Sequence, residues 1–94
     1  MENLKNLITN ALVEFNACGG AHILMSYALG DIELPNEVLS IMVCFNGAWE
    51  DADSDDDQEL DRILDHYTGE VINWLKANGL YEHALNNSSY GYKQ

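Results

Sequence analysis

Hydrophobic residues recur every three to four positions in two long stretches of the chain, which is the spacing of one face of an α-helix. In residues 3–17 these positions are Leu4, Leu7, Ile8, Ala11, Leu12 and Phe15. In residues 57–77 they are Leu60, Ile63, Leu64, Tyr67, Val71, Trp74 and Leu75. The first stretch is followed by Gly19-Gly20 and the second by Asn78-Gly79, which are residues that commonly end a helix. The pattern therefore predicts two amphipathic helices.

The chain between these helices has a less decisive pattern. Residues 21–29 are apolar, but the run is too short for its periodicity to separate a buried helix from a strand. Residues 38–45 are apolar on most faces, and Val, Ile and Phe there also favour strands. Because Pro35 and Glu37 form a helix start signal, we predict a largely enclosed helix that ends at Asn46-Gly47.

These elements predict an all-α fold, a compact bundle of four or five short helices. A further helical turn is expected between Leu80 and Leu85, so that residues 1–85 form one helical domain. Residues 86–94 are polar, and we expect them to form a mobile tail. The alternative is an α+β domain with a hairpin within residues 22–49.

The net charge changes this picture more than any other feature of the composition. Sixteen Asp and Glu face four Lys and Arg, which gives a formal charge of −12. Such a charge promotes solubility and disfavours direct binding to nucleic acid or to an anionic membrane, which both select Lys and Arg. The expected partner is a basic protein surface. No apolar run approaches the ~20 residues that span a bilayer, and no signal-peptide pattern opens the chain, so we expect a cytoplasmic location.

Motifs that would indicate an enzyme, a cofactor or a structural metal are not found. Cys18 and Cys44 stand in apolar stretches without metal-ligand spacing, and we predict two buried thiols in a reducing compartment. The three histidines lack a nucleophile or paired carboxylate in motif spacing, and there is no Gly-rich phosphate loop, GxSxG or HExxH. His66 and Glu70, four residues apart, predict a surface ion pair. We therefore expect no catalytic residues, no cofactor and no enzymatic activity.

Ten acids gather between residues 50 and 70. They are Glu50, Asp51, Asp53, Asp55, Asp56, Asp57, Glu59, Asp61, Asp65 and Glu70. Five of them precede Asp57, where the second helix is expected to begin, and carboxylates there would stabilise the positive end of the helix dipole. Asp56 with Glu59 also resembles a capping box. Part of the acidic block therefore has a structural use.

The dipole does not account for the row Asp57, Asp61 and Asp65. These positions repeat every fourth residue, about 6 Å apart along a helix, and like charges at that spacing repel. A sequence shaped for stability alone would place Lys or Arg in the row. We therefore predict that a basic partner docks there. Carboxylates at several-ångström steps are a fair copy of a DNA strand, whose phosphates advance ~3.4 Å per residue.

A calcium loop is the alternative interpretation of the run DADSDDD. The side chains at its ligand positions 1, 3, 5 and 7 would be Asp51, Asp53, Asp55 and Asp57. However, Asp56 stands where an EF-hand has Gly, and Arg62 stands where it has a bidentate Glu. No EF-hand is therefore predicted, and loose binding of divalent cations remains an alternative.

In length and charge, and in the run EDADSDDD that leads into an acid-lined helix, the chain resembles the small phage and plasmid inhibitors called DNA mimics. These include anti-restriction and anti-CRISPR proteins. The resemblance covers the charge layout of residues 50–70. It implies an inhibitor of a restriction or CRISPR-type nuclease, acting in the host cytoplasm if the gene is carried by a phage.

The ending INWLKANGLYEHALNNSSYGYKQ also resembles the end of nuclease-colicin immunity proteins, although their tyrosine-pair motif has no counterpart here. That resemblance implies a protein that blocks a nuclease toxin by shape, with its acids as steering charges. A homodimer and a structural adaptor are further options. The expected partner-binding residues are Glu50, Asp51, Asp53, Asp55, Asp56, Asp57, Asp61, Asp65 and Trp49. Trp49 suits a core position and an interface position equally.

Overall fold

Five helices make up most of the part of the chain that the computed structural model describes, which is residues 2–18, 22–53 and 55–87. They are α1 (Glu2–Cys18), α2 (His22–Ala28), α3 (Asn36–Asp51), α4 (Asp57–Ala77) and α5 (Tyr81–Asn87). Those residues contain no strand, so the predicted all-α fold is confirmed. The undecided residues 21–29 form helix α2, and the alternative of a hairpin within residues 22–49 is wrong.

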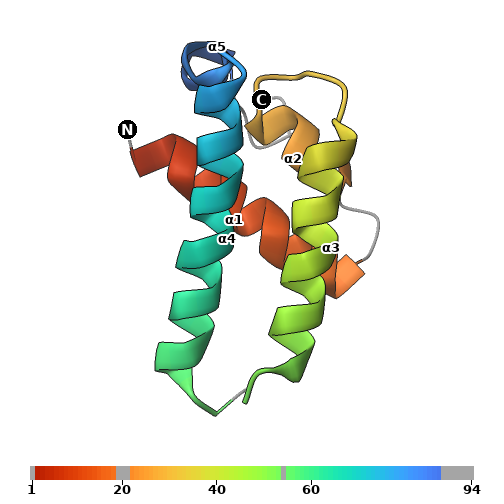
Figure 1. The fold of residues 1–94 in the computed structure, drawn as a ribbon, viewed down its shortest axis with the longest axis vertical. Coiled ribbons are helices and arrows are strands. Elements are labelled where there is room, and N and C mark those ends of the chain that lie inside the picture. Colours follow the sequence, from red (N-terminus) through yellow and green to blue (C-terminus); the bar gives the residue numbers. More distant parts are fainter. Residues whose placement is uncertain (1, 19–21, 54, 88–94) are drawn as a thin grey trace.

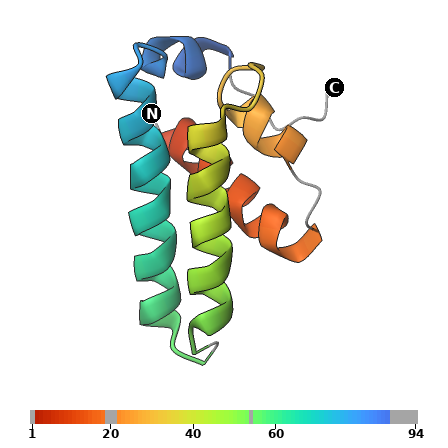
Figure 2. The same ribbon diagram turned by 45° about the vertical axis from the view of Figure 1, so that its right-hand side comes forward.

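The helices α3 and α4 form an antiparallel hairpin along the long axis of the molecule (Figure 1). Helix α1 crosses this hairpin and packs against α2, α3 and α4. Helix α5 lies across the open end of the hairpin, next to the end of α4 (Figure 2). The closed end, where the chain turns from α3 into α4, extends past the other helices in both views.

The hydrophobic core occupies the half of the hairpin that α1 and α2 cover. The buried apolar side chains are Leu4, Leu7, Ile8, Ala11, Leu12, Met25, Ala28, Leu29, Val38, Met42, Phe45, Val71, Leu75 and Ala84. In α3 the last buried residue is Phe45, and in α4 burial begins at Thr68. The hydroxyl of Thr68 is hydrogen-bonded to that of Thr9, 2.9 Å away, so this buried polar atom is satisfied. The closed end therefore projects from the core.

The two amphipathic helices form where the hydrophobic pattern predicts them. Helix α4 has the predicted bounds, and α1 exceeds residues 3–17 by one residue at each end. After α4 the chain turns at Gly79, whose φ is 70°, and the N–H of Leu80 donates to the carbonyl oxygen of Leu75 at 2.8 Å. This bond satisfies an end-of-helix carbonyl, as in a Schellman motif. Gly19 and Gly20 lie outside the described residues.

Helix α3 continues past its predicted end at Asn46-Gly47 and stops at Asp51. Gly47 faces open space, since an added Cβ would meet no atom within 4 Å. Its cost to the helix is therefore limited to propensity, about 1 kcal/mol relative to Ala. Two residues after Gly47, the ring of Trp49 packs on that of Phe45, with 5.3 Å between centroids. This packing anchors the extra turn that the glycine signal alone would not predict.

The prediction that α3 is enclosed on most faces is also wrong. The helix packs against α4 and α1, and these neighbours cover one side of it. On the opposite side Val43 is 56% exposed and Cys44 is exposed. The expected burial of Cys44 is therefore incorrect, because too few helices surround α3 to cover its outer side. The side chain of Cys18 lies outside the described part of the chain.

The further helical turn predicted between Leu80 and Leu85 is confirmed as α5. The helix begins at Tyr81 and reaches Asn87, two residues into the segment that the sequence assigns to the tail. Residues 88–94, the rest of that expected tail, lie outside the described residues.

Candidate functional site

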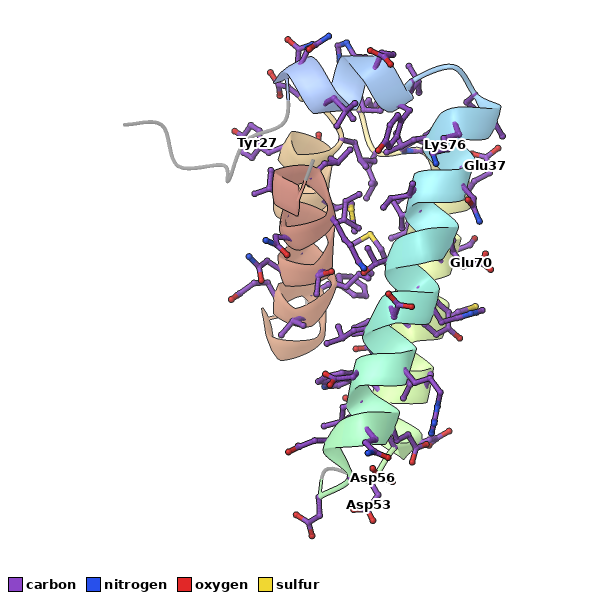
Figure 3. The ribbon with its side chains drawn as sticks, turned by 90° about the vertical axis from the view of Figure 1, so that its left-hand side faces the viewer. Tyr27, Glu37, Asp53, Asp56, Glu70 and Lys76 are labelled. Carbon is purple, nitrogen blue, oxygen red and sulfur yellow. The ribbon has the colours of Figure 1, made fainter. Side chains whose placement is uncertain are left out.

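The closed end of the α3–α4 hairpin carries six carboxylates, which we call the acid tip. They are Glu50, Asp51, Asp53, Asp55, Asp56 and Asp57, and all six are exposed. Figure 3 shows Asp53 and Asp56 at this end of the molecule, far from Tyr27 on α2 and from Lys76 near the other end of α4. These six acids are also close together in the sequence, where Ala52 and Ser54 are the other members of the run 50–57.

Two of these carboxylates organise the turn itself. Oδ1 of Asp53 accepts a hydrogen bond from the backbone N–H of Asp55 at 3.0 Å. Oδ1 of Asp56 accepts one from the backbone N–H of Glu59 at 3.1 Å, which confirms Asp56 as the N-cap of α4. A capping side chain of this type contributes about 1 kcal/mol to stability. Asp56 therefore has a structural use.

At the other end of the acid tip, the carboxylates lie at the C-terminus of a helix and not at an N-terminus. Glu50 and Asp51 lie in the last turn of α3, which contains no basic residue. The expectation that all five acids before Asp57 favour a helix dipole is therefore wrong for these two, because the dipole at a helix C-terminus is negative. The helix dipole alone disfavours a carboxylate at such an exposed position by roughly 0.3–1 kcal/mol.

The row Asp57, Asp61 and Asp65 is exposed on α4, as predicted, but its members differ in their surroundings. Nζ of Lys5 on α1 lies 3.1 Å from Oδ1 of Asp65. The two side chains are 56% and 74% exposed, so this ion pair contributes little to stability, about 0–1 kcal/mol. It does compensate the charge of Asp65. Asp57 is part of the acid tip, Asp61 lies about one turn beyond it on α4, and Asp65 belongs to the contact between α1 and α4.

Trp49 is half-buried at the base of the acid tip. Its ring stacks at a tilt of 31° on Phe45, and Phe45 in turn meets Tyr67 of α4 edge-on at 5.9 Å. Such aromatic pairs are worth about 0.5–1.5 kcal/mol beyond the area they bury. Of the two positions that the sequence allows for Trp49, the structure shows the packing one. Its contact with a partner remains a prediction.

The structure also shows the arrangement of the His66–Glu70 pair and of the candidate calcium loop. Nε2 of His66 lies 3.7 Å from the carboxylate of Glu70, which confirms the predicted surface pair. The candidate calcium loop is divided between two helices, since Asp51 ends α3 and Asp57 begins α4. Within the described ranges no group of three or more His, Cys, Asp or Glu side chains is arranged to hold a metal ion.

Lys5 and His83 are contact residues that the sequence does not reveal. The partner of Lys5 is 60 positions away on another helix, and Nε2 of His83 lies 2.8 Å from the carbonyl oxygen of Gly30. Neither pair has a local spacing signal, because each depends on which helices pack together.

Comparison with known proteins finds no family model, no curated protein and no solved structure that matches the chain. In the residues that the structure describes, none of the helices combines the length and the apolar character required to cross a membrane.

Proposed function

We propose that this protein is an inhibitor that binds a basic surface of a nucleic-acid-binding enzyme, such as a restriction or CRISPR-type nuclease, through the acid tip and Asp61. One observation carries the proposal. Six exposed carboxylates gather at a projecting end of the molecule, and one of them, Asp51, is the last residue of α3, where the helix dipole disfavours a negative charge.

The electrostatics of the tip favour a cationic partner. At the end of α3 the negative end of the helix dipole adds to the charges of Glu50 and Asp51. Lys5, on α1, does not compensate the tip, because it pairs with Asp65, which lies farther along α4. A cluster of one sign of charge raises the rate at which an oppositely charged partner associates, and it does so most strongly at low ionic strength.

The shape of the tip suggests how the partner approaches. The closed end of the hairpin projects past α1, α2 and α5, so it is convex (Figures 1 and 2). A convex acidic end fits a concave basic cleft, and clefts lined with Lys and Arg are what hold the phosphates of a nucleic acid. The carboxylates would occupy the phosphate positions and use the same basic side chains. The partner would then be blocked by occupation of its nucleic-acid site.

Matched charge variants test this proposal. The tip variant is Asp51→Lys with Asp61→Lys, and the control variant is Glu33→Lys with Glu82→Lys. All four side chains are exposed, and both variants change the net charge equally. Each protein is used to capture binding proteins from a lysate of the native host at low salt. We expect wild type and control variant to capture the same nucleic-acid-binding protein, and the tip variant to bind it at least tenfold more weakly.

The affinity of the captured complex should also fall steeply as NaCl rises from about 50 to 200 mM. The reason is that the carboxylates would bind the same Lys and Arg side chains that normally contact phosphates, and such contacts weaken with salt. A complex that persists in high salt and forms equally well with the tip variant would contradict the proposal. That outcome would instead favour inhibition by shape, as in immunity proteins. Circular dichroism establishes that each variant is folded before its binding is compared.

A further inference from the structure

Helix α5 lies at the end of the molecule opposite the acid tip (Figures 1 and 2). It is seven residues long, and a helix of that length is not stable in water without tertiary contacts. Its buried side chain is Ala84, and Tyr81 and Leu85 pack partly against the core. Nζ of Lys76 lies over the ring of Tyr81, 5.0 Å from its centroid. These contacts give α5 less buried apolar surface than α3 or α4 has.

A hydrogen bond joins α5 to the turn that follows α2. Nε2 of His83 lies 2.8 Å from the carbonyl oxygen of Gly30, which is 53 positions away in the sequence. Nδ2 of Asn87 donates to the carbonyl oxygen of His83 at 2.9 Å and lies 3.3 Å from Nδ1 of the same residue. A carbonyl oxygen can only accept, so Nε2 of His83 donates the hydrogen of the bond to Gly30.

The fit of His83 against this turn depends on glycine. Gly30 is buried and has a φ of +97°. A Cβ added there would lie 2.6 Å from Cδ2 and 2.9 Å from Nε2 of the His83 ring. The imidazole therefore occupies the space that any other residue at position 30 would fill. We call the His83–Gly30 contact the clasp.

We infer that α5 is a strap that opens as a unit while the rest of the core stays folded, and that the clasp sets how often it opens. The hinge is the turn at Asn78-Gly79, where Gly79 has a φ of 70°. Opening uncovers Gly30, which is buried and in contact with His83 when the strap is closed. The inference does not depend on the proposed function, because the acid tip lies at the other end of the hairpin.

Amide hydrogen exchange of the full chain tests the strap, since local openings and global unfolding give distinct protection. In wild type the amides of Ala84 and Leu85 should share one level of protection, lower than that of Val71 and Leu75 in α4. His83→Ala should speed exchange at Ala84 and Leu85 about tenfold, which is the effect of losing one such hydrogen bond and its packing. The amides of Val71 and Leu75 should be unchanged.

Glu82→Ala is the matched control, because Glu82 is the exposed neighbour of His83 on the same helix. It should leave exchange at Ala84 and Leu85 within about twofold of wild type. Three results would overturn the inference. They are equal protection of α5 and α4 in wild type, a progressive loss of protection toward the C-terminus of α5, and equal acceleration of all four amides by His83→Ala.

Discussion

At the scale of single residues, the acid tip contains the same side chain in opposite electrostatic settings. Asp56 caps the start of α4, where its carboxylate satisfies the backbone N–H of Glu59. Asp51 lies in the last turn of α3, where the backbone carbonyls already point outward with negative partial charge. The first aspartate is explained by stability. The second is not, and this contrast separates structural acids from candidate functional ones.

Replacing Asp56 by Ala should lower the free energy of unfolding by about 1 kcal/mol, because the N–H of Glu59 loses its acceptor. For a domain of this size the melting temperature should fall by roughly 4–8 °C. Asp55→Ala is the control, since the neighbouring side chain does not cap the helix. Thermal unfolding followed by circular dichroism measures both, and equal effects of the two substitutions would exclude the capping role.

Replacing Asp51 by Lys should raise the free energy of unfolding by about 1 kcal/mol, because an unfavourable charge at the end of α3 becomes a favourable one. Urea titration at low salt measures the change. Glu33→Lys, at an exposed position outside the helices, makes the same change in net charge without the dipole effect. If Asp51→Lys were destabilising, the acids at this end would serve folding, and the argument for a binding role would fail.

At the scale of elements, the predictability of each helix follows from where its signals lie. The hydrophobic stripes of α1 and α4 are local, and so are the cap at Asp56 and the stop at Asn78-Gly79, so these helices are predicted within a residue. The end of α3 is not, because the contact of Trp49 with Phe45 outweighs the glycine signal. The exposure of Cys44 and the pairing of Lys5 with Asp65 depend on helix packing, which one-dimensional spacing does not encode.

Replacing Gly47 by Ala and replacing Gly79 by Ala should change the stability of the protein in opposite directions. Gly47→Ala should stabilise the protein by up to about 1 kcal/mol, because the site is helical and an added Cβ meets nothing within 4 Å. Gly79→Ala should destabilise it by about 1 kcal/mol or more, because a φ of 70° strains an L-residue. Chemical denaturation of both variants checks the pair. Stabilisation by Gly79→Ala would contradict the turn geometry.

At the scale of the whole molecule, a charge of −12 on 94 residues sets the balance between solubility and self-repulsion. The position of the acidic block is evident from the sequence. Its division between the end of α3, the turn and the start of α4 is not, because that division depends on where α3 stops. The folded protein therefore has a strongly negative projecting end and an apolar core at the covered end.

Self-repulsion predicts that added NaCl stabilises the protein. The urea midpoint should rise between about 0.02 and 0.5 M NaCl, because the Debye length falls from tens of ångströms to a few. The tip variant Asp51→Lys with Asp61→Lys should show a smaller rise, since it carries less repulsion at the closed end. A midpoint that falls with salt would show that favourable ion pairs, such as Lys5 with Asp65, outweigh the repulsion.

The central claim is that the acid tip occupies the phosphate positions of a nucleic-acid site. Competition between nucleic acid and this protein for the purified captured partner tests it most directly. The account predicts that the partner's own duplex DNA or RNA displaces the protein at low salt, and that the two never bind together. A stable ternary complex of partner, nucleic acid and this protein would contradict the claim.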